Sequence, residues 1–525
     1  MISIKRRKRM SETTEKIFKE YEQGIAFKES MGLFKTVNEA ERLFAGDQWA
    51  GLSASNMPKP VFNIIKRIIQ YKVAAVKSTP TALVVARDSV DRTPGEAENI
   101  GELMTGLISN VWERLKMDAR NYSGLKDAAL SGDYILYFYW NPTVKTGQPY
   151  LGDINCEAVD NVNFFPGNPN LPDIQKQPYI ILSFREFTQR LINEAKENKI
   201  PTYGSIRPDG EFVYGAGDSS SRELDGSEKT LCLLKLYRDD RGNIRSVKVC
   251  RDSVIKEDSP TGLTLYPVAM MNWEERKNCV HGISEVYNLK PNQLYINKAF
   301  AQAMLNSMLF SFPKMIYDNS RIKKPSNTIG GAIAVNGNID GAVRYLEPPS
   351  MSGDLFTLIE STIAHTKELM GANDVSLGNT NPTNTSAFIA VSEASEVPLE
   401  GIRMRFYRMV EDMGRIILDF ITSFYKKGRL VAFGSDENRK YVTVDFAALK
   451  NKILNLKVDV GPAGQYTEAI AVSTLDKLLT AGKISFVQYL ERIPDGYIPA
   501  KQKLIEENLI QQSKETEKGN ENAER

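Results

Sequence analysis

The sequence predicts an α+β protein that is mainly helical, and three observations support this prediction. Apolar residues recur at helical spacing near the start of the chain, as in Val61–Val76. Tyr134–Trp140 is rich in aromatic and β-branched residues, which favours a strand. From Ser284 onward the helical spacing returns. Because 525 residues can form several hydrophobic cores, we expect three or four structural regions.

The composition is that of an ordinary globular protein, with 25% charged and 42% hydrophobic residues. The net charge of +2 argues against a chain that is basic throughout, since nucleic-acid-binding domains usually have a pI above about 9. No run of about 18 apolar residues is present, so no membrane-spanning segment is expected. The basic start lacks the apolar stretch of a signal peptide, and we expect a cytosolic protein where it is made.

Neither metal nor disulfide chemistry is expected. The chain has only two histidines and its cysteines form no C-x-x-C pair, which argues against a zinc site. Scattered thiols of this kind are typical of reduced intracellular cysteines. We therefore expect no cofactor and four free thiols, at Cys156, Cys232, Cys250 and Cys279.

The N-terminal region is predicted to be helical after a short disordered start. Residues 1–12 include five consecutive basic residues, Lys5–Arg9. A solvated, disordered segment is the favoured interpretation, and an arm for nucleic acid or an acidic partner is the alternative. Thr13–Lys77 has helical spacing, with breaks at Gly46-Asp47 and at Ser53–Pro60.

Strands are predicted after a further helix at Glu96–Leu115. Asn141-Pro142 indicates a turn, and Asp239–Gly242 indicates a hairpin turn. Tyr203–Ser227 is rich in Gly, Ser and Asp and is expected to form an exposed loop. The predicted strands are Tyr134–Trp140, Tyr179–Phe184, Leu231–Tyr237 and Asn243–Val249.

A sparsely charged helix opens the second half of the chain. Ser284–Phe312 contains three charged residues, so we expect most of it to be buried against neighbours, in the same chain or in copies of it. Pro291 should kink this helix or mark its first turn. Phe312–Pro349 is Gly-rich and β-like, which indicates a small insertion. The next helix is expected to start at Ser352 and to end at Gly371.

A long polar loop follows that helix. Ala372–Ser386 consists mainly of Asn, Thr, Ser, Gly and Pro, and Asp374 is its one charged residue. Connections of this length within helical regions are uncommon and are usually functional or disordered. Such a surface binds partners poorly but suits something that must slide past. Ala387–Lys427 then has helical spacing, and Pro398 predicts a kink.

Strands and helices are predicted for the end of the chain. Beyond Pro398, one helix face is apolar and the others carry charges that include Arg403 and Asp419; the apolar face comprises Ile402, Phe406, Met409, Met413, Ile416, Phe420 and Phe424. The later elements are strands at Tyr441–Phe446 and Ile453–Val460, helices at Thr467–Ala481, Ser485–Arg492 and Lys501–Gln512, and a disordered tail.

The motifs of several enzyme classes are absent from the sequence. It contains no P-loop, no dinucleotide-binding glycine motif, no H-E-x-x-H and no G-x-S-x-G. His365 is predicted on a charged helix face, where a solvated side chain is the favoured interpretation. His281 could act as a base, but no nearby Ser or Cys has an evident activating partner, so a structural role is favoured. We predict that the protein is not an enzyme.

Four segments resemble portal proteins of tailed bacteriophages, the head-to-tail connectors of the siphovirus type. They are F-A-G-D-Q-W (Phe44–Trp49), Pro58–Ser78, His281–Phe300 and S-L-G-N-T-N-P-T-N-T-S-A-F-I-A-V (Ser376–Val391). The similarity extends from about Phe44 to about Phe424, and it fades in the Phe312–Pro349 insertion and after Val460.

This resemblance implies a subunit with a wing, a two-helix stem, a clip that contains a small β-structure, a tunnel loop, a kinked long helix and a helical crown. The disordered ends are expected at 1–12 and 513–525. The implied regions are the wing at 13–283 and 428–462, the stem helices at 284–311 and 350–371, the clip at 312–349, the tunnel loop at 372–386, the long helix at 387–427 and the crown at 463–512.

The resemblance also implies a homo-oligomeric ring of about twelve subunits at the unique capsid vertex of the virion, assembled in the host bacterial cytoplasm. Double-stranded DNA would pass through it during packaging and ejection. The implied partners are the terminase large subunit, a head-completion adaptor, the major capsid protein and a scaffold protein, without a membrane. The clip would dock terminase and adaptor. It carries a modest excess of basic residues, which could meet an acidic partner or DNA at the exit, whereas a solvated surface is the favoured interpretation; they are Lys314, Arg321, Lys323, Lys324 and Arg344.

The tunnel loop has the chemistry that this role requires. A channel lined with many Lys or Arg would bind DNA strongly and stall its movement. Polar side chains can make weak, exchangeable bonds to phosphates or hydration water without reading sequence. The implied channel residues are Asn373, Asp374, Ser376, Asn379, Thr380, Asn381, Thr383, Asn384 and Thr385.

Two other interpretations are left open by the sequence. The first is another ring-forming or scaffolding protein of a phage head, in which the polar loop is a linker. The second is an intracellular hydrolase of an unrecognised type. The ring number in solution, the host and the residues that contact terminase are not determined by the sequence.

Overall fold

The fold was examined in a computed structural model of the chain. It describes residues 2–51, 57–78, 81–87, 94–145, 150–209, 228–311, 315–324, 333–345, 353–372, 397–425, 430–433, 440–443, 446, 454–460, 472, 474–493, 498, 501, 503–505 and 508. These residues form a mixed α/β structure in which about half of the residues are helical.

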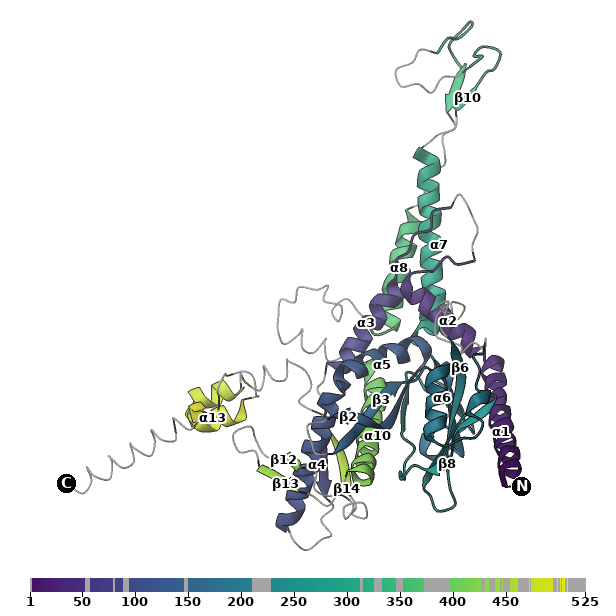
Figure 1. The fold of residues 1–525 in the computed structure, drawn as a ribbon. Helices are drawn as coiled ribbons and strands as arrows, with labels where there is room; N and C mark the ends of the chain where they lie inside the picture. Colours follow the sequence, from purple (N-terminus) through teal and green to yellow (C-terminus); the bar gives the residue numbers. More distant parts are fainter. Residues whose placement is uncertain are drawn as a thin grey trace, which may run out of the picture.

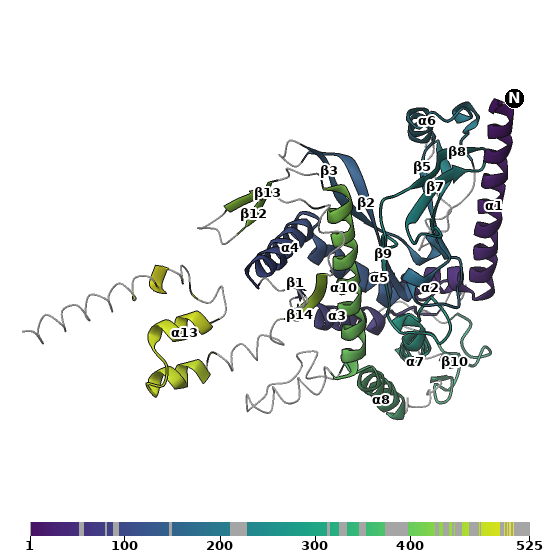
Figure 2. The same cartoon turned by 90° about the horizontal axis from the view of Figure 1, so that it is seen from below.

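A five-stranded antiparallel sheet forms one part of the body. In order across the sheet, its strands are β4 (Phe164–Pro166), β5 (Tyr179–Phe187), β6 (Lys229–Arg238), β7 (Ile244–Cys250) and β8 (Ser253–Pro260). Helices α1 (Ile2–Ser30) and α6 (Thr188–Glu197) pack against it, and Figure 2 shows α1 along its outer side. Ile181, Leu191 and Leu233 are fully buried in the core that these elements share.

A three-stranded sheet covered by helices forms another part. Its order is β3 (Leu151–Ala158), β2 (Asp133–Lys145) and β9 (Val268–Asn272). Helix α5 (Met117–Ser131) lies so close to β2 that a Cβ atom at Gly124 would be 2.1 Å from the Tyr134 ring. The long helix α10 (Glu400–Phe424) packs against β9 with its apolar face, which buries Phe406 and Met413 in the main core.

Three further helices complete the body: α2 (Leu33–Ala45), α3 (Ile64–Lys77) and α4 (Pro94–Arg114). Strand β1 (Thr81–Arg87) pairs antiparallel with β14 (Leu454–Val460), so the C-terminal region of the chain returns to the N-terminal half. Short 3₁₀ turns occur at η1 (Asn161–Asn163), η2 (Ile174–Lys176), η3 (Tyr203–Ser205) and η5 (Val397–Leu399).

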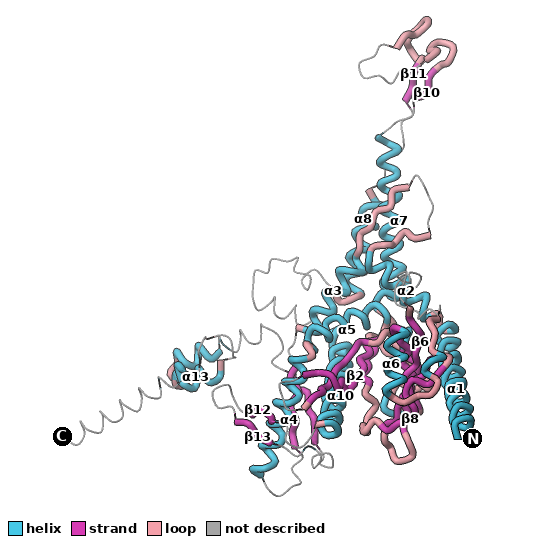
Figure 3. Tube along the Cα trace, viewed as in Figure 1, coloured by secondary structure: helices cyan, strands magenta, loops and turns pink. Residues whose placement is uncertain are grey.

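Two helices project from the body as a stem (Figure 1). They are α7 (Glu285–Ser311) and α8 (Asp354–Leu369). Asn292 Nδ2 of α7 donates to Thr366 Oγ1 of α8 at 3.1 Å. Beyond the stem lies the tip unit, residues 315–324 and 333–345, in which β10 (Met315–Tyr317) pairs with β11 (Val343–Tyr345). Figure 3 shows strands in the body and at the tip, with the two stem helices and loop segments beside them in between.

The last described elements are β12 (Leu430–Phe433), β13 (Lys440–Thr443) and α13 (Phe486–Arg492). Helix α13 begins with a reciprocal cap, since Ser485 Oγ accepts from Gln488 N and Gln488 Oε1 accepts from Ser485 N. Within the described residues, none of the helices combines the length and apolar character that a bilayer crossing demands.

Most predicted elements occur in the structure. Three of the four predicted strands of the first half are longer in the structure, and the fourth, β7, is shifted by one residue from the predicted Asn243–Val249. The breaks at Gly46 and at Asp239–Gly242 are present. Gly371 ends α8 in the left-handed conformation, with φ of 67°. The four cysteines are free and buried. The predicted apolar face of α10 is buried except for partly exposed Phe424.

Several expectations differ from the structure. Helix α1 begins at Ile2 instead of following a disordered stretch, because it continues outward from the turn that buries Met10 and Thr14. Asn141-Pro142 is not a turn, since β2 continues to Lys145. The pairing of β2 with β3 shifts register between Asn141 and Lys145, which accommodates the proline within the strand. Gly353, not Ser352, precedes α8, and Ser352 lies outside the described residues.

Candidate stem interface and channel segment

Two buried amide side chains of α7 fix the base of the stem. Gln293 Oε1 accepts from the backbone N–H of Ile64 at 2.8 Å, and Gln293 Nε2 donates to the Phe62 carbonyl at 2.6 Å. Asn297 Nδ2 donates to Gln48 Oε1 at 2.5 Å. The first N–H groups of a helix lack partners within the helix, so the stem satisfies donors at the start of α3. Stem and body are therefore joined by specific polar contacts.

These contacts unite three of the four segments on which the resemblance was based. Phe44–Trp49 ends α2, Pro58–Ser78 contains α3, and His281–Phe300 contains the first half of α7. Asn63 caps α3 through Lys66 N and donates from Nδ2 to the Phe44 carbonyl at 2.9 Å. Segments that are remote in sequence thus form one junction.

A buried ion pair lies at the first turn of α7. Lys72 Nζ of α3 is 2.6 Å from Glu285 Oε1, and both side chains are more than nine-tenths buried. Trp273 Nε1 donates to Glu285 Oε2 at 2.7 Å. Glu285 also lies where the helix dipole favours negative charge. Because a buried charge without its partner is strongly unfavourable, this pair fixes how α7 leaves the body.

Within the described chain, the stem leaves apolar side chains uncovered on both helices. Tyr287 and Tyr295 of α7 are 64% and 46% exposed. On α8, Leu358 and Leu369 are 49% and 76% exposed. Tyr287 and Tyr295 are eight residues apart and Leu358 and Leu369 are eleven apart, so the two members of each pair lie toward the same side of their helix. We call these pairs the α7 stripe and the α8 stripe, although exposed His365 lies between the two leucines. The expectation was burial of α7 against neighbours in the same chain or in copies of it, and within this chain α7 is buried on the side that faces the body.

Helix α10 is held to the body by two arginines. Arg403 Nη2 donates to the Ala75 carbonyl at the end of α3 at 3.2 Å, and Arg405 Nη2 donates to the Trp273 carbonyl at 2.6 Å. Arg403 was predicted on a charged side of the helix, and the structure shows that it is buried. Its guanidinium satisfies the Ala75 carbonyl at the end of α3, where carbonyl groups lack helical partners.

The predicted channel segment lies outside the described residues. This holds for the whole set, Asn373, Asp374, Ser376, Asn379, Thr380, Asn381, Thr383, Asn384 and Thr385. Its flanks are described, and they meet: a Cβ atom at Gly371 would lie 3.2 Å from Pro398 Cβ. Pro398 lies in η5 directly before α10, and the helical stretch predicted before it is also outside the described residues.

The predicted docking residues of the tip have different surroundings. Arg321 contacts Asp318 at 3.3 Å and the Asn338 and Asp340 carbonyls, so it holds the tip unit together. Lys323, Lys324 and Arg344 are exposed. Lys314 lies outside the described residues.

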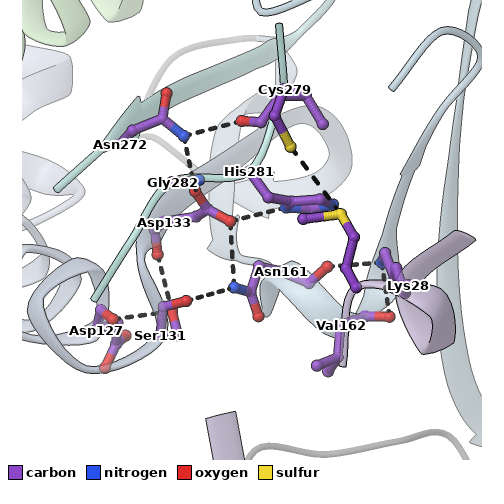
Figure 4. A network of polar contacts seen from close by, with 12 residues as sticks. Lys28, Asp127, Ser131, Asp133, Asn161, Val162, Asn272, Cys279, His281 and Gly282 are labelled. Atoms are coloured by element: carbon purple, nitrogen blue, oxygen red, sulfur yellow. Dashed lines mark hydrogen bonds and ion pairs between the residues drawn. The ribbon is translucent and has the colours of Figure 1, made fainter. Parts of the chain in front are cut away.

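His281 lies in a buried polar network (Figure 4). Its Nδ1 atom is 2.8 Å from Asp133 Oδ2, and neither side chain is exposed. Asp133 Oδ1 also accepts from Gly282 N and Asn272 Nδ2. The network therefore fixes the Nδ1 side of the ring, whereas the buried Nε2 atom has no hydrogen-bond partner among the described residues. His365 is exposed on α8, as predicted, with Glu368 Oε2 3.7 Å away.

Lys28 of α1 lies beside this network. Its Nζ donates to the carbonyls of Asn161 and Val162 at 2.6 and 2.9 Å and lies 3.6 Å from the centre of the Phe165 ring. Burial lowers the pKa of Lys28 well below its usual range, and the negative charge of Asp133 opposes this effect.

The sequence analysis missed the residues that position the stem. Gln293, Asn297 and Lys72 appear in it only as members of helical stretches. One signal was present, because two amides four residues apart on a sparsely charged helix must find partners if they are buried. Their partners, however, are more than 200 residues away in sequence.

Comparison with known proteins gives the family. A model of the phage P22-like portal protein family matches residues 194–481, which is more than half of the chain. The matched region includes α7, the tip unit, α8 and α10. No curated protein matches the chain. The chain belongs to the P22-like family of phage portal proteins.

Proposed function

We propose that this portal protein assembles into a closed ring at the unique vertex of the capsid, through which double-stranded DNA passes during packaging and ejection. The observation that supports the proposal best is the stem, with uncovered apolar stripes on α7 and α8. The siphovirus-type subclass remains a prediction, since the matching family is the P22-like one.

The two stripes support a ring because they are different surfaces. A contact between two unlike patches is head-to-tail, and repetition of such a contact closes into a ring when the rotation permits. We propose that Tyr287 and Tyr295 of one subunit face the α8 stripe of the next, in a ring of about twelve subunits.

The channel is proposed to be lined by residues 372–386. Gly371 and Pro398 meet at the end of the stem, so the intervening segment leaves and rejoins the body at one place. All of its residues except Asp374 are uncharged, and most are polar. DNA would therefore meet groups that bind phosphates weakly and exchange quickly, without strong counterion-linked attraction.

The tip unit is the proposed clip, which docks the terminase large subunit and then the head-completion adaptor. Its exposed basic residues Lys323, Lys324 and Arg344 would meet acidic groups of these partners, whereas Arg321 serves the clip's own structure. The body is proposed to be the wing, which would face the major capsid protein and a scaffold protein.

Electron microscopy of the purified protein tests the ring. Rings of about twelve subunits with a central hole are expected. If the purified protein stays monomeric at high concentration, or forms a closed assembly without a hole, the proposed DNA conduit is refuted. The alternative of a scaffolding protein is then favoured. An unrecognised hydrolase would instead show turnover that depends on His281, which the buried surroundings of that side chain argue against.

A second experiment addresses the channel. Replacement of Asn379, Asn381 and Asn384 by Lys should leave ring assembly intact and impair DNA packaging, because added positive charge would hold the phosphate backbone. The same positions replaced by Gln provide the control for side-chain length. Unchanged packaging by the Lys variant would show that this segment does not face DNA.

A further inference from the structure

The first residues of α1 carry a charge pattern that opposes the helix they form. Lys5–Arg9 are five consecutive basic residues near the start of this helix. The N-terminal end of a helix carries a partial positive charge, so cations are unfavourable there, and the first turn of α1 contains no acidic residue. Basic residues four positions apart, such as Lys5 and Arg9, also repel each other. The basic run therefore destabilises its own helical turns.

The neighbouring residues of α1 do not offset this repulsion. Glu12 is the one acidic residue within four positions of the run, and its spacing allows a helical pair with Lys8 or Arg9 alone. From Ser11 to Ser30 the helix has five acidic and three basic residues, a net charge of −2, whereas Lys5–Arg9 carries +5. Segments that break a local rule without a compensating gain are expected at functional sites. The pattern indicates that an anionic partner from outside the chain meets the run.

Helix α1 is fixed to the five-stranded sheet directly after the run. Met10, Ile17 and Tyr21 are buried in the core that α1 shares with this sheet. The Tyr21 ring meets the Phe165 ring edge to face, with 4.7 Å between the ring centres. Because a helix is difficult to nucleate and easy to extend, the packed turns support the turns that precede them. The body thus presents the basic run as the continuation of a packed helix.

The position of this helix end favours one kind of partner. Figures 1 and 2 show the N-terminal end of α1 at the edge of the body, and Figure 1 shows it on the side away from the stem and the tip unit. In the proposed function the tip unit meets the terminase, from which DNA enters the capsid. The opposite side of the body then faces the capsid interior and the packaged DNA. This step rests on the proposed function.

We propose that the basic run Lys5–Arg9 of α1 binds the phosphate backbone of packaged double-stranded DNA, outside the channel and without reading its sequence. Five helical residues span about 7 Å, and duplex DNA carries one negative charge per about 1.7 Å of its axis, so several phosphates lie within reach of the run. Each residue is turned by about 100° from the last, so the run covers the whole circumference of the helix. One flat acidic surface of a protein would meet only some of the five residues, whereas packed DNA can approach from every side.

This contact differs from the proposed channel in its charge and in its place. The channel segment 372–386 is almost uncharged, which suits DNA that moves past it. The basic run lies at the edge of the body, away from that path, so a strong and salt-dependent contact there does not hold the moving duplex.

Covalently closed circular DNA provides the direct test, because it cannot thread through a closed ring and therefore reports contacts outside the channel. Its binding to the full-length protein is measured by sedimentation over a series of salt concentrations. Replacement of all five residues by Gln should weaken binding about tenfold or more at about 50 mM salt. The slope of log K against log salt should become shallower by about 0.9 for each lost phosphate contact. The substitutions are Lys5→Gln, Arg6→Gln, Arg7→Gln, Lys8→Gln and Arg9→Gln.

A matched control removes the same charge from other exposed positions on α1, α6 and β8. It should bind circular DNA with nearly the affinity and salt slope of the wild type. Loss of folding is not expected for the variant of the basic run, because Gln relieves the repulsion within the helix; circular dichroism checks this. The control substitutions are Lys16→Gln, Lys19→Gln, Arg190→Gln, Lys196→Gln and Lys256→Gln.

Equal weakening by the two variants would overturn the proposal, since the effect would then follow from net charge alone. A wild-type protein that fails to bind circular DNA but binds polyglutamate would also overturn it, and would assign the run to an acidic protein partner. Rings with a central hole that do not bind circular DNA would contradict this inference and leave the conduit intact. Binding that depends on Lys5–Arg9 in a protein that forms no ring would support the DNA contact and contradict the conduit.

Discussion

Gly371 and Pro398 lie in contact although 26 residues separate them, and a Cβ atom at position 371 would be 3.2 Å from Pro398 Cβ. Gly371 also has a φ of 67°, which L side chains adopt only at a cost. Two independent constraints thus require glycine where the stem ends. The contact closes the base of the segment that we propose to line the channel.

Substitution of Gly371 separates these two constraints. Gly371→Ala should destabilise the protein by more than about 1 kcal/mol, since the left-handed conformation alone has a penalty of that order. Gly482 is the matched control: it has the same φ of 67°, also follows a helix, and has nothing within 4 Å of an added Cβ. Thermal unfolding should show a larger loss for Gly371→Ala than for Gly482→Ala. Equal losses would mean that the Pro398 contact contributes nothing.

The Lys72–Glu285 pair should be important for the stability of the stem base. Glu285→Gln leaves the buried Lys72 charge without its partner, which typically destabilises by about 3–5 kcal/mol. Asp118→Asn removes the partner of Lys77 at 2.8 Å, but the Asp118 side chain is 69% exposed, so the loss should be under about 1 kcal/mol. Urea unfolding followed by tryptophan fluorescence compares the two. A small effect of Glu285→Gln would show that the pair is solvated.

The α7 stripe should control assembly. Tyr295→Glu places a charge in the proposed apolar contact, and we expect dissociation into monomers by light scattering, with unchanged circular dichroism. Tyr203 of η3 is similarly exposed, at 41% against 46% for Tyr295. Tyr203→Glu should therefore leave the assembly intact. Rings that survive Tyr295→Glu would exclude this face from the interface.

Asp127 should make stability depend on pH. Its pKa is raised to about 6 in the folded protein by burial and by Asp160, with Lys126 opposing, whereas a carboxyl in the unfolded chain titrates near 3.8. Between these values the folded state holds more protons, so its contribution to stability falls as pH rises and is constant above about pH 6. Without divalent cations, the free energy of unfolding of Asp127→Asn should rise relative to that of the wild type between pH 4 and pH 6. The rise should be at most about 1 kcal/mol because the residue is exposed. A difference in stability between the two proteins that does not change with pH would contradict the repulsion between Asp127 and Asp160.

Local patterns in the sequence predicted most of the regular structure. The strand at Tyr134–Trp140 and the helical face from Ile402 to Phe420 depend on spacing that neighbouring residues alone define. Gly371 was recognisable as a helix end for the same reason. The predicted turn at Asn141-Pro142 failed because pairing of β2 with β3 carries the strand past the proline.

The surfaces proposed for assembly were less predictable from the sequence than the helices and strands. The two-helix stem was expected from the resemblance, but the sequence could not show which of its side chains remain uncovered, because burial depends on neighbours. Arg403 illustrates this point. Its position in the sequence placed it on a charged side of the helix, whereas its hydrogen bond to the Ala75 carbonyl holds the side chain buried against the body.

What the sequence by itself determined was the order of the elements, the α+β class and the kinship with portal proteins, since these depend on local spacing and on recognisable segments. The tertiary structure decided how the elements are fixed to one another. Gln293 reaches the start of α3, Glu285 meets Lys72, and Arg403 donates to the Ala75 carbonyl. Partners hundreds of residues apart are chosen by packing, and no local pattern of residues encodes that choice.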